Sequence, residues 1–424
     1  MPKNLATPKR LDTTRALRIA LPFVIALALL GSFFVTSAQQ QQENQKQRPR
    51  RVSDSREQKT PGTTAGPYSS TETQVGEELD DGDVVRVDTQ LVSVPAVVTD
   101  PSGRIMPNLR AENFIVFEDG RPQQISNFAT TEAPFEIALL LDTSGSTRAD
   151  IGLIRRAARV FLDALRPGDR VAIVAFNNSE SGTDSLATVD VVTKLTSDRE
   201  ELQKGLESIG ASNGTPYYDA LARISQEVFR DSPREEVRGR RAVVALTDGV
   251  DSASDHDFTE AREKLRRAGV ACYFIQVNTE DFVEDRLLRD CKEFGTLRLS
   301  RTQLQRYRRI FVPRADATSY EDFCRMGQFE RMQISRSLYD LARGEMKDLA
   351  RTLGGKTFPA SDLRDARAAF AQVAAEIGTQ YSLGYYSTNK ARDGRFRSIK
   401  VEVRGVAGGA AQVRAREGYY APKS

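Results

Sequence analysis

The sequence has no tryptophan, only one histidine and three cysteines among its 424 residues. The scarcity of histidine and the lack of a Cys-x-x-Cys pair argue against a zinc site, which draws on several of these side chains. Neither sign of charge dominates, because 61 basic residues stand against 58 acidic ones and leave a net charge of +3. Such a small excess gives no case for nucleic acid as a partner.

The first 38 residues look like an export signal or an N-terminal membrane anchor. A basic start precedes the apolar, charge-free run 19–35, and small residues at 36–38 offer a cleavage site. The run is long for a signal peptide and short for a membrane span of about 20 residues, so a cleaved and an anchored form both fit. Positive charge ahead of the run places the rest of the chain outside the cytoplasm, in the periplasm, cell envelope or extracellular space.

Residues 39–82 are rich in Gln, Ser, Thr and Arg and poor in apolar residues, and are predicted to be a disordered linker. An exported protein with three cysteines is expected to pair some of them. Cys272 lies in the apolar run 270–275 and is expected to be a buried free thiol. Cys291 and Cys324 fall in one irregular region, and their spacing leaves open whether they pair.

Both ends of the folded part are predicted to be β-structure. Residues 83–130 form an N-terminal β module, and residues 379–424 supply further strands. We expect both ends to join in one smaller β-sandwich-like module; separate β additions are the alternative. Turn and strand signals place strands at 84–99, 113–118 and 124–128, with the last pairing back across a hairpin at Asp119-Gly120, and at 381–386, 399–403 and 411–416.

Residues 131–378 alternate between strand and helix patterns, which predicts the α/β class with a doubly wound, mostly parallel sheet. The segment at about 279–344 does not fit this repeat. It is expected to be an insertion with one or two helices, which either shapes a partner surface or has no direct role. The predicted strands are 135–141, 170–176, 187–195, 241–247, 270–277 and 356–358, and the helices 149–165, 198–209, 217–229, 258–268, 346–353 and 363–377.

Oxygen-bearing side chains follow several of these strands. Asp142, Ser144 and Ser146 come after strand 135–141, Asp248 ends strand 241–247, and Thr215 lies in a loop before a helix. The carboxyl ends of parallel strands meet at one edge, where the binding crevice of such a sheet lies. Two carboxylates and three hydroxyls there suit a hard divalent cation, which prefers oxygen ligands.

Each residue also has a simpler explanation. Thr215 before Pro216 is a good helix cap, and the two serines could cap the helix that follows them. Asp248-Gly249 is an ordinary turn signal. These separate explanations do not account for the convergence of all five side chains on one edge.

The order Asp-x-Ser-x-Ser, then a distant Thr and a distant Asp, resembles the metal-ion-dependent adhesion site of the von Willebrand factor type A (VWFA) domain. Asp142, Ser144, Ser146, Thr215 and Asp248 carry all five expected residues. The layout of residues 83–422 further resembles a bacterial VWFA-related subfamily, through stretches that include Glu118-Asp119-Gly120, Tyr381–Tyr386 and Gly418–Pro422.

The resemblance implies a function. In this family the two Ser and the Thr ligate the metal directly, and the two Asp act largely through water. The expected cofactor is Mg²⁺, with Mn²⁺ or Ca²⁺ as alternatives, and the expected partner is a protein that presents Asp or Glu to the cation. Ligand-linked movement of the helix 363–377 is a further implication. The alternative is a structural envelope protein whose metal only stabilises the loops.

The nearest enzymatic alternative is a magnesium-dependent phosphoryl hydrolase with Asp142 as nucleophile. Such an enzyme needs a second carboxylate two residues later, where Ser144 stands. A Ser-His-Asp hydrolase would have to use His256, which looks like an exposed loop residue. We therefore expect no catalysis, and no membrane contact other than the N-terminal segment if it is uncleaved.

Overall fold

The computed structural model describes residues 91–130, 133–145, 151–179, 186–237, 239–289, 291, 297–406 and 411–423. Contacts divide the chain into two units, Met1–Gly82 and Asp83–Ser424, and all the described residues belong to the second. The predicted export signal and linker therefore lie outside the described residues. In the part of the chain that is described, no helix combines the length and apolar character needed to cross a membrane.

A six-stranded sheet forms the centre of the fold, in the order β10-β9-β8-β5-β6-β7. Its strands run parallel except β7, which joins the edge antiparallel to β6. Continuous apolar runs form the inner strands, because both faces of the sheet are covered. The strands are β5 (Glu136–Leu141), β6 (Arg170–Asn178), β7 (Ala187–Thr196), β8 (Arg241–Thr247), β9 (Ala271–Val277) and β10 (Lys356–Ala360).

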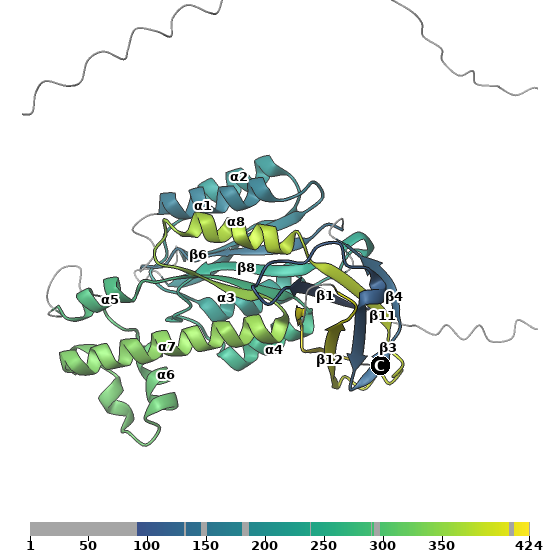
Figure 1. Ribbon diagram of the computed structural model, residues 1–424. Helices are drawn as coiled ribbons and strands as arrows, with labels where there is room; N and C mark the ends of the chain where they lie inside the picture. The colour runs from purple at the N-terminus through teal and green to yellow at the C-terminus, as the bar shows by residue number, and fades with distance from the viewer. Residues whose placement is uncertain are drawn as a thin grey trace, which may run out of the picture. The chain divides into compact units, whose positions relative to one another are not determined.

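Helices cover both faces of this sheet, which confirms the predicted α/β class (Figure 1). One apolar core joins the sheet to α1, α2 and α8, and a second core on the other face joins it to α3, α4 and the end of α7. The helices are α1 (Ile151–Ala164), α2 (Arg199–Ser208), α3 (Tyr217–Arg223) with a π-helical continuation (Ile224–Val228), α4 (Phe258–Ala268), α7 (Gln328–Leu353) and α8 (Ala366–Ile377).

The long helix α7 corrects a predicted boundary. The sequence placed a helix at 346–353 and ended the insertion at Gly344, whereas α7 runs over 26 residues, Gln328–Leu353. Buried side chains recur about one turn apart in the part that had been assigned to the insertion, as at Ile334 and Leu338. Burial of this apolar stripe outweighs the cost of about 1 kcal/mol of having Gly344 inside the helix.

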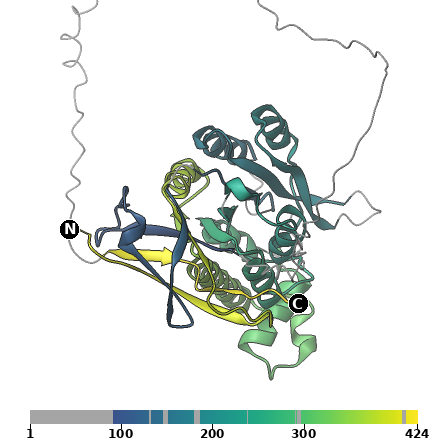
Figure 2. The same ribbon diagram turned by 90° about the vertical axis from the view of Figure 1, so that its right-hand side faces the viewer.

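Strands from both ends of the chain lie side by side in two further sheets, as predicted (Figure 2). The orders are β13-β1-β11-β4 and β14-β12-β2-β3, and all pairings are antiparallel. The two sheets share one apolar core, and we call them the β module. Its strands are β1 (Leu91–Thr99), β2 (Phe114–Glu118), β3 (Arg121–Gln123), β4 (Ile125–Ala129), β11 (Tyr381–Tyr386), β12 (Phe396–Val403), β13 (Gln412–Ala415) and β14 (Gly418–Tyr420).

The predicted hairpin forms, but one strand was assigned the wrong partner. Asp119 and Gly120 have φ values of 47° and 78°, as a tight hairpin turn requires, and β2 pairs with β3 across them. The strand expected to pair back, now β4, instead crosses to the other sheet and pairs with β11. Turn chemistry specifies the hairpin, whereas the position of β4 depends on a strand from the other end of the chain.

A buried carboxylate at the end of β2 connects the two ends of the chain. Glu118 accepts hydrogen bonds from the hydroxyls of Tyr385 (2.8 Å) and Tyr419 (3.0 Å). It also accepts one from Ser387 (2.6 Å) and pairs with the guanidinium of Arg397 (3.4 Å). All four partners belong to the C-terminal segment. A buried carboxylate is tolerated only when its oxygens are bonded, so the β module needs both ends of the chain.

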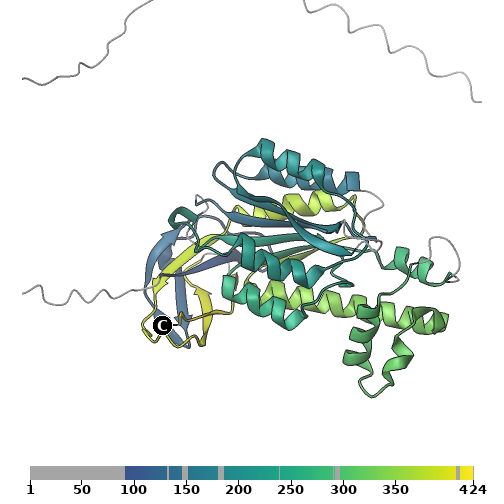
Figure 3. The same cartoon turned by 180° about the vertical axis from the view of Figure 1, so that it is seen from behind.

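The segment after β9 forms a helical insertion with its own apolar core, at one end of the sheet (Figure 3). We use this name for residues 279–344, which hold α5 (Glu280–Leu287), α6 (Arg301–Phe311) and the first part of α7. A disulfide joins Cys291 to Cys324, which decides the pairing that the spacing left open. Cys272 is a buried free thiol, as predicted.

We expect Glu118→Ala to lower the free energy of unfolding by about 3–5 kcal/mol, because it leaves the buried Arg397 guanidinium without its carboxylate. Chemical denaturation measures the change. The control is Glu112→Ala, which removes only an exposed pair with Arg110 and should leave the stability nearly unchanged. Equal, small losses in both variants would contradict the structural role of Glu118.

Candidate metal site

The predicted site residues Asp142 and Asp248 follow neighbouring strands of the central sheet. β5 and β8 pair in parallel, with Leu141 beside Leu246, so both strands present their carboxyl ends to the same edge. Asp142 opens the loop after β5 and Asp248 opens the loop after β8. Their exposed fractions are 0% and 3%. Two carboxylates are therefore buried away from water at adjacent strand ends.

Asp142 is held by hydrogen bonds from Ser144 and Thr247 and repelled by its neighbour Asp248. One oxygen accepts the backbone N–H of Ser144 (3.0 Å), and the other accepts the hydroxyl of Thr247 (2.6 Å). Burial, and then the negative charge of Asp248, raise the pKa of Asp142 to about 7, while its hydrogen bonds lower it in part. A bound cation would relieve both the desolvation and the repulsion.

Asp248 is fixed by residues from two other parts of the chain. Its Oδ1 accepts the N–H of Val250 (3.0 Å), and its Oδ2 accepts the hydroxyl of Thr279 (2.6 Å). The Thr279 hydroxyl also contacts the phenol of Tyr339 on α7 (2.7 Å). Neither Thr279 nor Tyr339 was predicted from the sequence. Thr279 follows β9 and could have been found by the same strand-end argument, whereas Tyr339 lies inside a helix and carries no such signal.

Thr215 precedes α3 but does not cap it. The N-cap position is Pro216, which makes no side-chain cap hydrogen bond. Instead, Oδ2 of Asp251 accepts the N–H groups of Tyr217 (2.9 Å) and Tyr218 (3.3 Å). The interpretation of Thr215 as a helix cap is therefore wrong, and the first turn of α3 leaves its hydroxyl unused.

Short hydrogen bonds join the Thr215 loop to the loops of the two aspartates. The N–H of Ser212 donates to the carbonyl of Thr143 (2.9 Å). The N–H of Thr215 donates to the hydroxyl of Ser252 (2.8 Å), and the N–H of Ser252 donates back to the carbonyl of Thr215 (3.0 Å). Two loops that follow β5 and β8 are thus connected to a third, which joins α2 to α3.

Four of the five predicted ligand residues, Asp142, Ser144, Thr215 and Asp248, lie on these three connected loops, and all four are buried. The fifth, Ser146, lies outside the described residues. Within the described ranges, no group of three or more His, Cys, Asp or Glu could hold a metal. A cation at this edge would therefore need the hydroxyls as well as the carboxylates, a ligand set that suits Mg²⁺.

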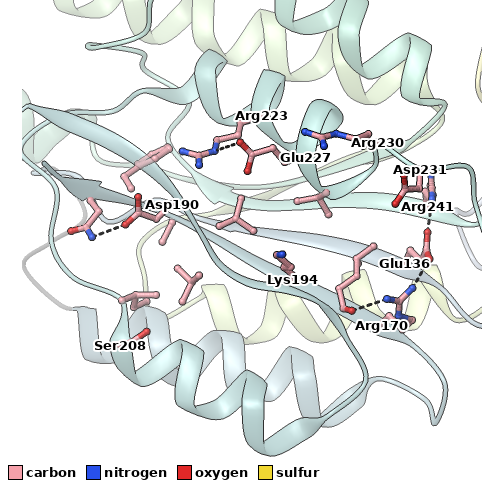
Figure 4. A pocket seen from close by; sticks show the side chains of 18 of the residues that line it. Glu136, Arg170, Asp190, Lys194, Ser208, Arg223, Glu227, Arg230, Asp231 and Arg241 are labelled. Carbon is pink, nitrogen blue, oxygen red and sulfur yellow. Dashed lines mark hydrogen bonds and ion pairs between the residues drawn. The ribbon is translucent and has the colours of Figure 1, made fainter.

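A cavity of about 890 Å³ lies beside the edge strand β7, and none of the predicted ligand residues lines it (Figure 4). Half of its charged side chains are paired with one another. Glu136 pairs with Arg170 (2.9 Å) and Arg241 (2.8 Å), and Arg223 pairs with Glu227 (2.8 Å). These pairs stabilise the sheet edge, and we assign the cavity no part in the candidate site.

Two features that resemble hydrolase machinery have structural roles. His256 lies in a loop, as predicted, but it is only partly exposed, and its Nδ1 bonds to Asp219 (2.8 Å). Ser212 stands in Gly210-Ala211-Ser212-Asn213-Gly214, which has the spacing of a nucleophile elbow. Its side chain is fully buried, and its hydroxyl contacts the carbonyls of Asn177 (3.1 Å) and Gly214 (2.8 Å). Ser212 therefore braces the Thr215 loop.

Residues 136–292 match the family model of the von Willebrand factor type A domain. The match runs from β5 past β9 and includes every predicted ligand residue. No curated protein matches the chain. Domains of type A commonly mediate protein–protein interactions and are generally not enzymes.

Several solved structures are similar to this chain at low sequence identity. The von Willebrand factor type A protein from Catenulispora acidiphila is 12% identical, with a TM-score of 0.37 and coverage of 80% of this chain and 75% of that one. Proximal thread matrix protein 1 from the mussel byssus is 15% identical, with a TM-score of 0.38 and coverage of 62% and 51%, so the chain spans about half its length. The vWF domain of the pilus tip protein Mfa5 from Porphyromonas gingivalis is 15% identical, with a TM-score of 0.23 and coverage of 28% and 39%.

The buried carboxylate predicts a pH dependence of the metal-free protein. Since the pKa of Asp142 is raised from 3.8 to about 7, the folded chain binds this proton more tightly than the unfolded chain does. The resulting stability is present below about pH 4 and is lost as the pH rises through about 7. In chelator, Asp142→Asn should remove this loss and gain stability relative to the wild type at about pH 8.

Thermal unfolding of both proteins between about pH 5 and pH 8 measures the effect, with Asp163→Asn on the exposed side of α1 as the matched control. Parallel pH profiles for the wild type and Asp142→Asn would contradict the repulsion between the two buried carboxylates.

Proposed function

We propose that this protein is an exported protein-binding module that uses a divalent cation to bind an acidic residue of a partner. The cation would be held by Asp142, Ser144, Ser146, Thr215 and Asp248. The observation that carries the proposal is the buried pair of aspartates at adjacent strand ends, with the pKa of Asp142 raised to about 7. Folding keeps two like charges together out of water, and a cation is the simplest compensation for that arrangement.

The ligand chemistry supports a partner that brings its own carboxylate. Neutral hydroxyl ligands leave a divalent cation with uncompensated positive charge, and a carboxylate oxygen from outside the chain would complete its coordination with a strong charge pair. Mg²⁺ is the proposed cation, with Mn²⁺ and Ca²⁺ as alternatives. The match to the type A domain supports a protein as the source of that carboxylate.

The disulfide between Cys291 and Cys324 supports export, because such bonds persist in oxidising compartments. It agrees with the export signal or anchor proposed for the first 38 residues. We propose the periplasm, the cell envelope or the extracellular space as the location.

We expect Mg²⁺ to raise the melting temperature of the wild type and not that of Asp142→Ala. Binding to the folded state alone stabilises it by about 2.7 kcal/mol at a concentration 100 times the Kd. Isothermal titration of Mg²⁺ and Mn²⁺ gives the affinity directly. Ser144→Ala should bind the cation more weakly but remain folded in chelator, and Asp163→Ala serves as the surface control. No saturable binding to a folded wild type would refute the metal site.

The adhesion function requires a coordination position open to solvent. In protein loaded with Mn²⁺, water exchanging at that position would enhance proton relaxation. A short peptide containing glutamate should displace the water and lower this enhancement, and the same peptide with glutamine should not. Metal binding without any effect of the glutamate peptide would favour the alternative, in which the cation only stabilises the loops.

A further inference from the structure

We propose that the helical insertion sets the geometry of the cation site, with Tyr339 and Thr279 as positioning residues for Asp248. The inference rests on the proposed function for its metal-binding consequence. It assigns a role to a segment that lies largely beyond the match to the type A domain, which ends at residue 292.

The first support is a relay of two hydroxyls that ends on the carboxylate. Thr279 donates its single hydroxyl proton to Oδ2 of Asp248 (2.6 Å), so the phenol of Tyr339 must be the donor in its 2.7 Å contact with Thr279. All three side chains are buried. Aligned hydrogen bonds away from water strengthen one another, and this relay fixes the direction of one oxygen of Asp248.

The hydroxyl of Thr279 serves this relay although its position favours another bond. Thr279 is the N-cap residue of α5, where a threonine usually accepts a backbone N–H from the first turn of its helix. It makes no such cap hydrogen bond here. Its hydroxyl is turned to Asp248 and Tyr339 instead, so the start of the insertion is used to hold the carboxylate.

Packing joins the same loop to the insertion and to the part of α7 that follows it. Gly249, directly after Asp248, has φ +76°, and a Cβ there would lie 2.8 Å from Cε of Met346 on α7. Val250 is buried in the apolar core of the insertion together with Leu338. The first residue after Asp248 therefore packs against α7 and the second lies in the core that α7 helps to form, so a shift of α7 would displace them.

A second polar contact reaches the other loop of the site. The hydroxyl of Ser300, at the N-cap of α6, donates to the carbonyl of Ser252 (2.7 Å). Ser252 is the residue that exchanges two hydrogen bonds with Thr215. The insertion thus contacts the Asp248 loop at both ends and, through Ser252, the Thr215 loop.

A third contact involves the first turn of α3, the helix that follows Thr215. The carboxylate of Glu345 on α7 accepts a hydrogen bond from the phenol of Tyr218 (2.7 Å). Each of its two oxygens also accepts a hydrogen bond from the guanidinium of Arg306 on α6 (2.8 and 2.9 Å). The guanidinium lies 4.6 Å from the centre of the Tyr218 ring. Because Tyr218 is in the first turn of α3, α7 and, through Arg306, the insertion also hold the helix that begins beside Thr215.

These contacts matter for affinity because Mg²⁺ tolerates little deviation from octahedral geometry. Loss of a group that orients a metal ligand typically weakens binding about 10- to 100-fold. We therefore expect Tyr339→Phe to weaken Mn²⁺ binding about tenfold, and Thr279→Val to weaken it at least as much.

The test compares these two variants with Tyr320→Phe in the full-length protein. Tyr320 is also buried in the core of the insertion, where its ring packs 5.9 Å from that of Tyr307, so it controls for the loss of a phenol as such. Two readouts are measured: Mn²⁺ affinity by calorimetric titration, and amide hydrogen exchange of peptides covering 247–255, in chelator.

We expect Tyr339→Phe and Thr279→Val each to exchange faster in 247–255 and to bind Mn²⁺ more weakly than the wild type. Tyr320→Phe should show neither change. Exchange and affinity equal to those of Tyr320→Phe would overturn the proposal. If the wild type binds no Mn²⁺, the proposed function fails, and the exchange of 247–255 in chelator decides the positioning role by itself. If Tyr339→Phe also accelerates exchange throughout 328–353, the insertion has loosened, and Thr279→Val decides.

Discussion

The burial of two aspartates at neighbouring strand ends constrains everything around them. β5 and β8 are adjacent in the sheet, so Asp142 and Asp248 cannot move apart without breaking its centre. Burial, and then the negative charge of Asp248, raise the pKa of Asp142 to about 7. The surrounding loops supply donors to both carboxylates, among them the hydroxyls of Thr247 and Thr279. The site therefore surrounds two negatively charged carboxylates with hydrogen-bond donors. A cation would stabilise the same negative charge.

The hydroxyls at the site are not needed to bond the backbone N–H groups of the loops, because other residues form those hydrogen bonds. The first N–H groups of a helix need partners, and Asp251 accepts two of them at α3. Thr215 is thereby released from capping. Ser212 and Ser252 join its loop to the loops of Asp142 and Asp248. These hydrogen bonds form within the protein itself and connect the three loops at one edge of the sheet.

The sequence predicted most of the core because its signals are local. Both β8 and α4 were placed to the residue by their local patterns, and in the structure a capping box marks the start of α4, where Asp257 and Glu260 bond each other's backbone. The closeness of Asp142 and Asp248 followed from the shared edge of the parallel strands β5 and β8. The features that were missed depend on distant segments. β4 takes its partner from the other end of the chain, and Tyr339 has the appearance of an ordinary core residue until α7 is placed against Thr279.

Arg240 bonds both chain segments that connect the β module to the central sheet. Arg240 is fully buried and donates to the carbonyls of Ala133, just before β5, and Ile377, at the end of α8. Burial lowers its pKa to about 10, so it remains charged at neutral pH and its bonds are charge-assisted. Only three residues separate α8 from β11, which pairs with both β1 and β4. A shift of α8 of the kind that the family resemblance implies would therefore have to break the bonds of Arg240 or pull β11 with it. The short junction would transmit that movement to the β module, because it is too short to absorb it.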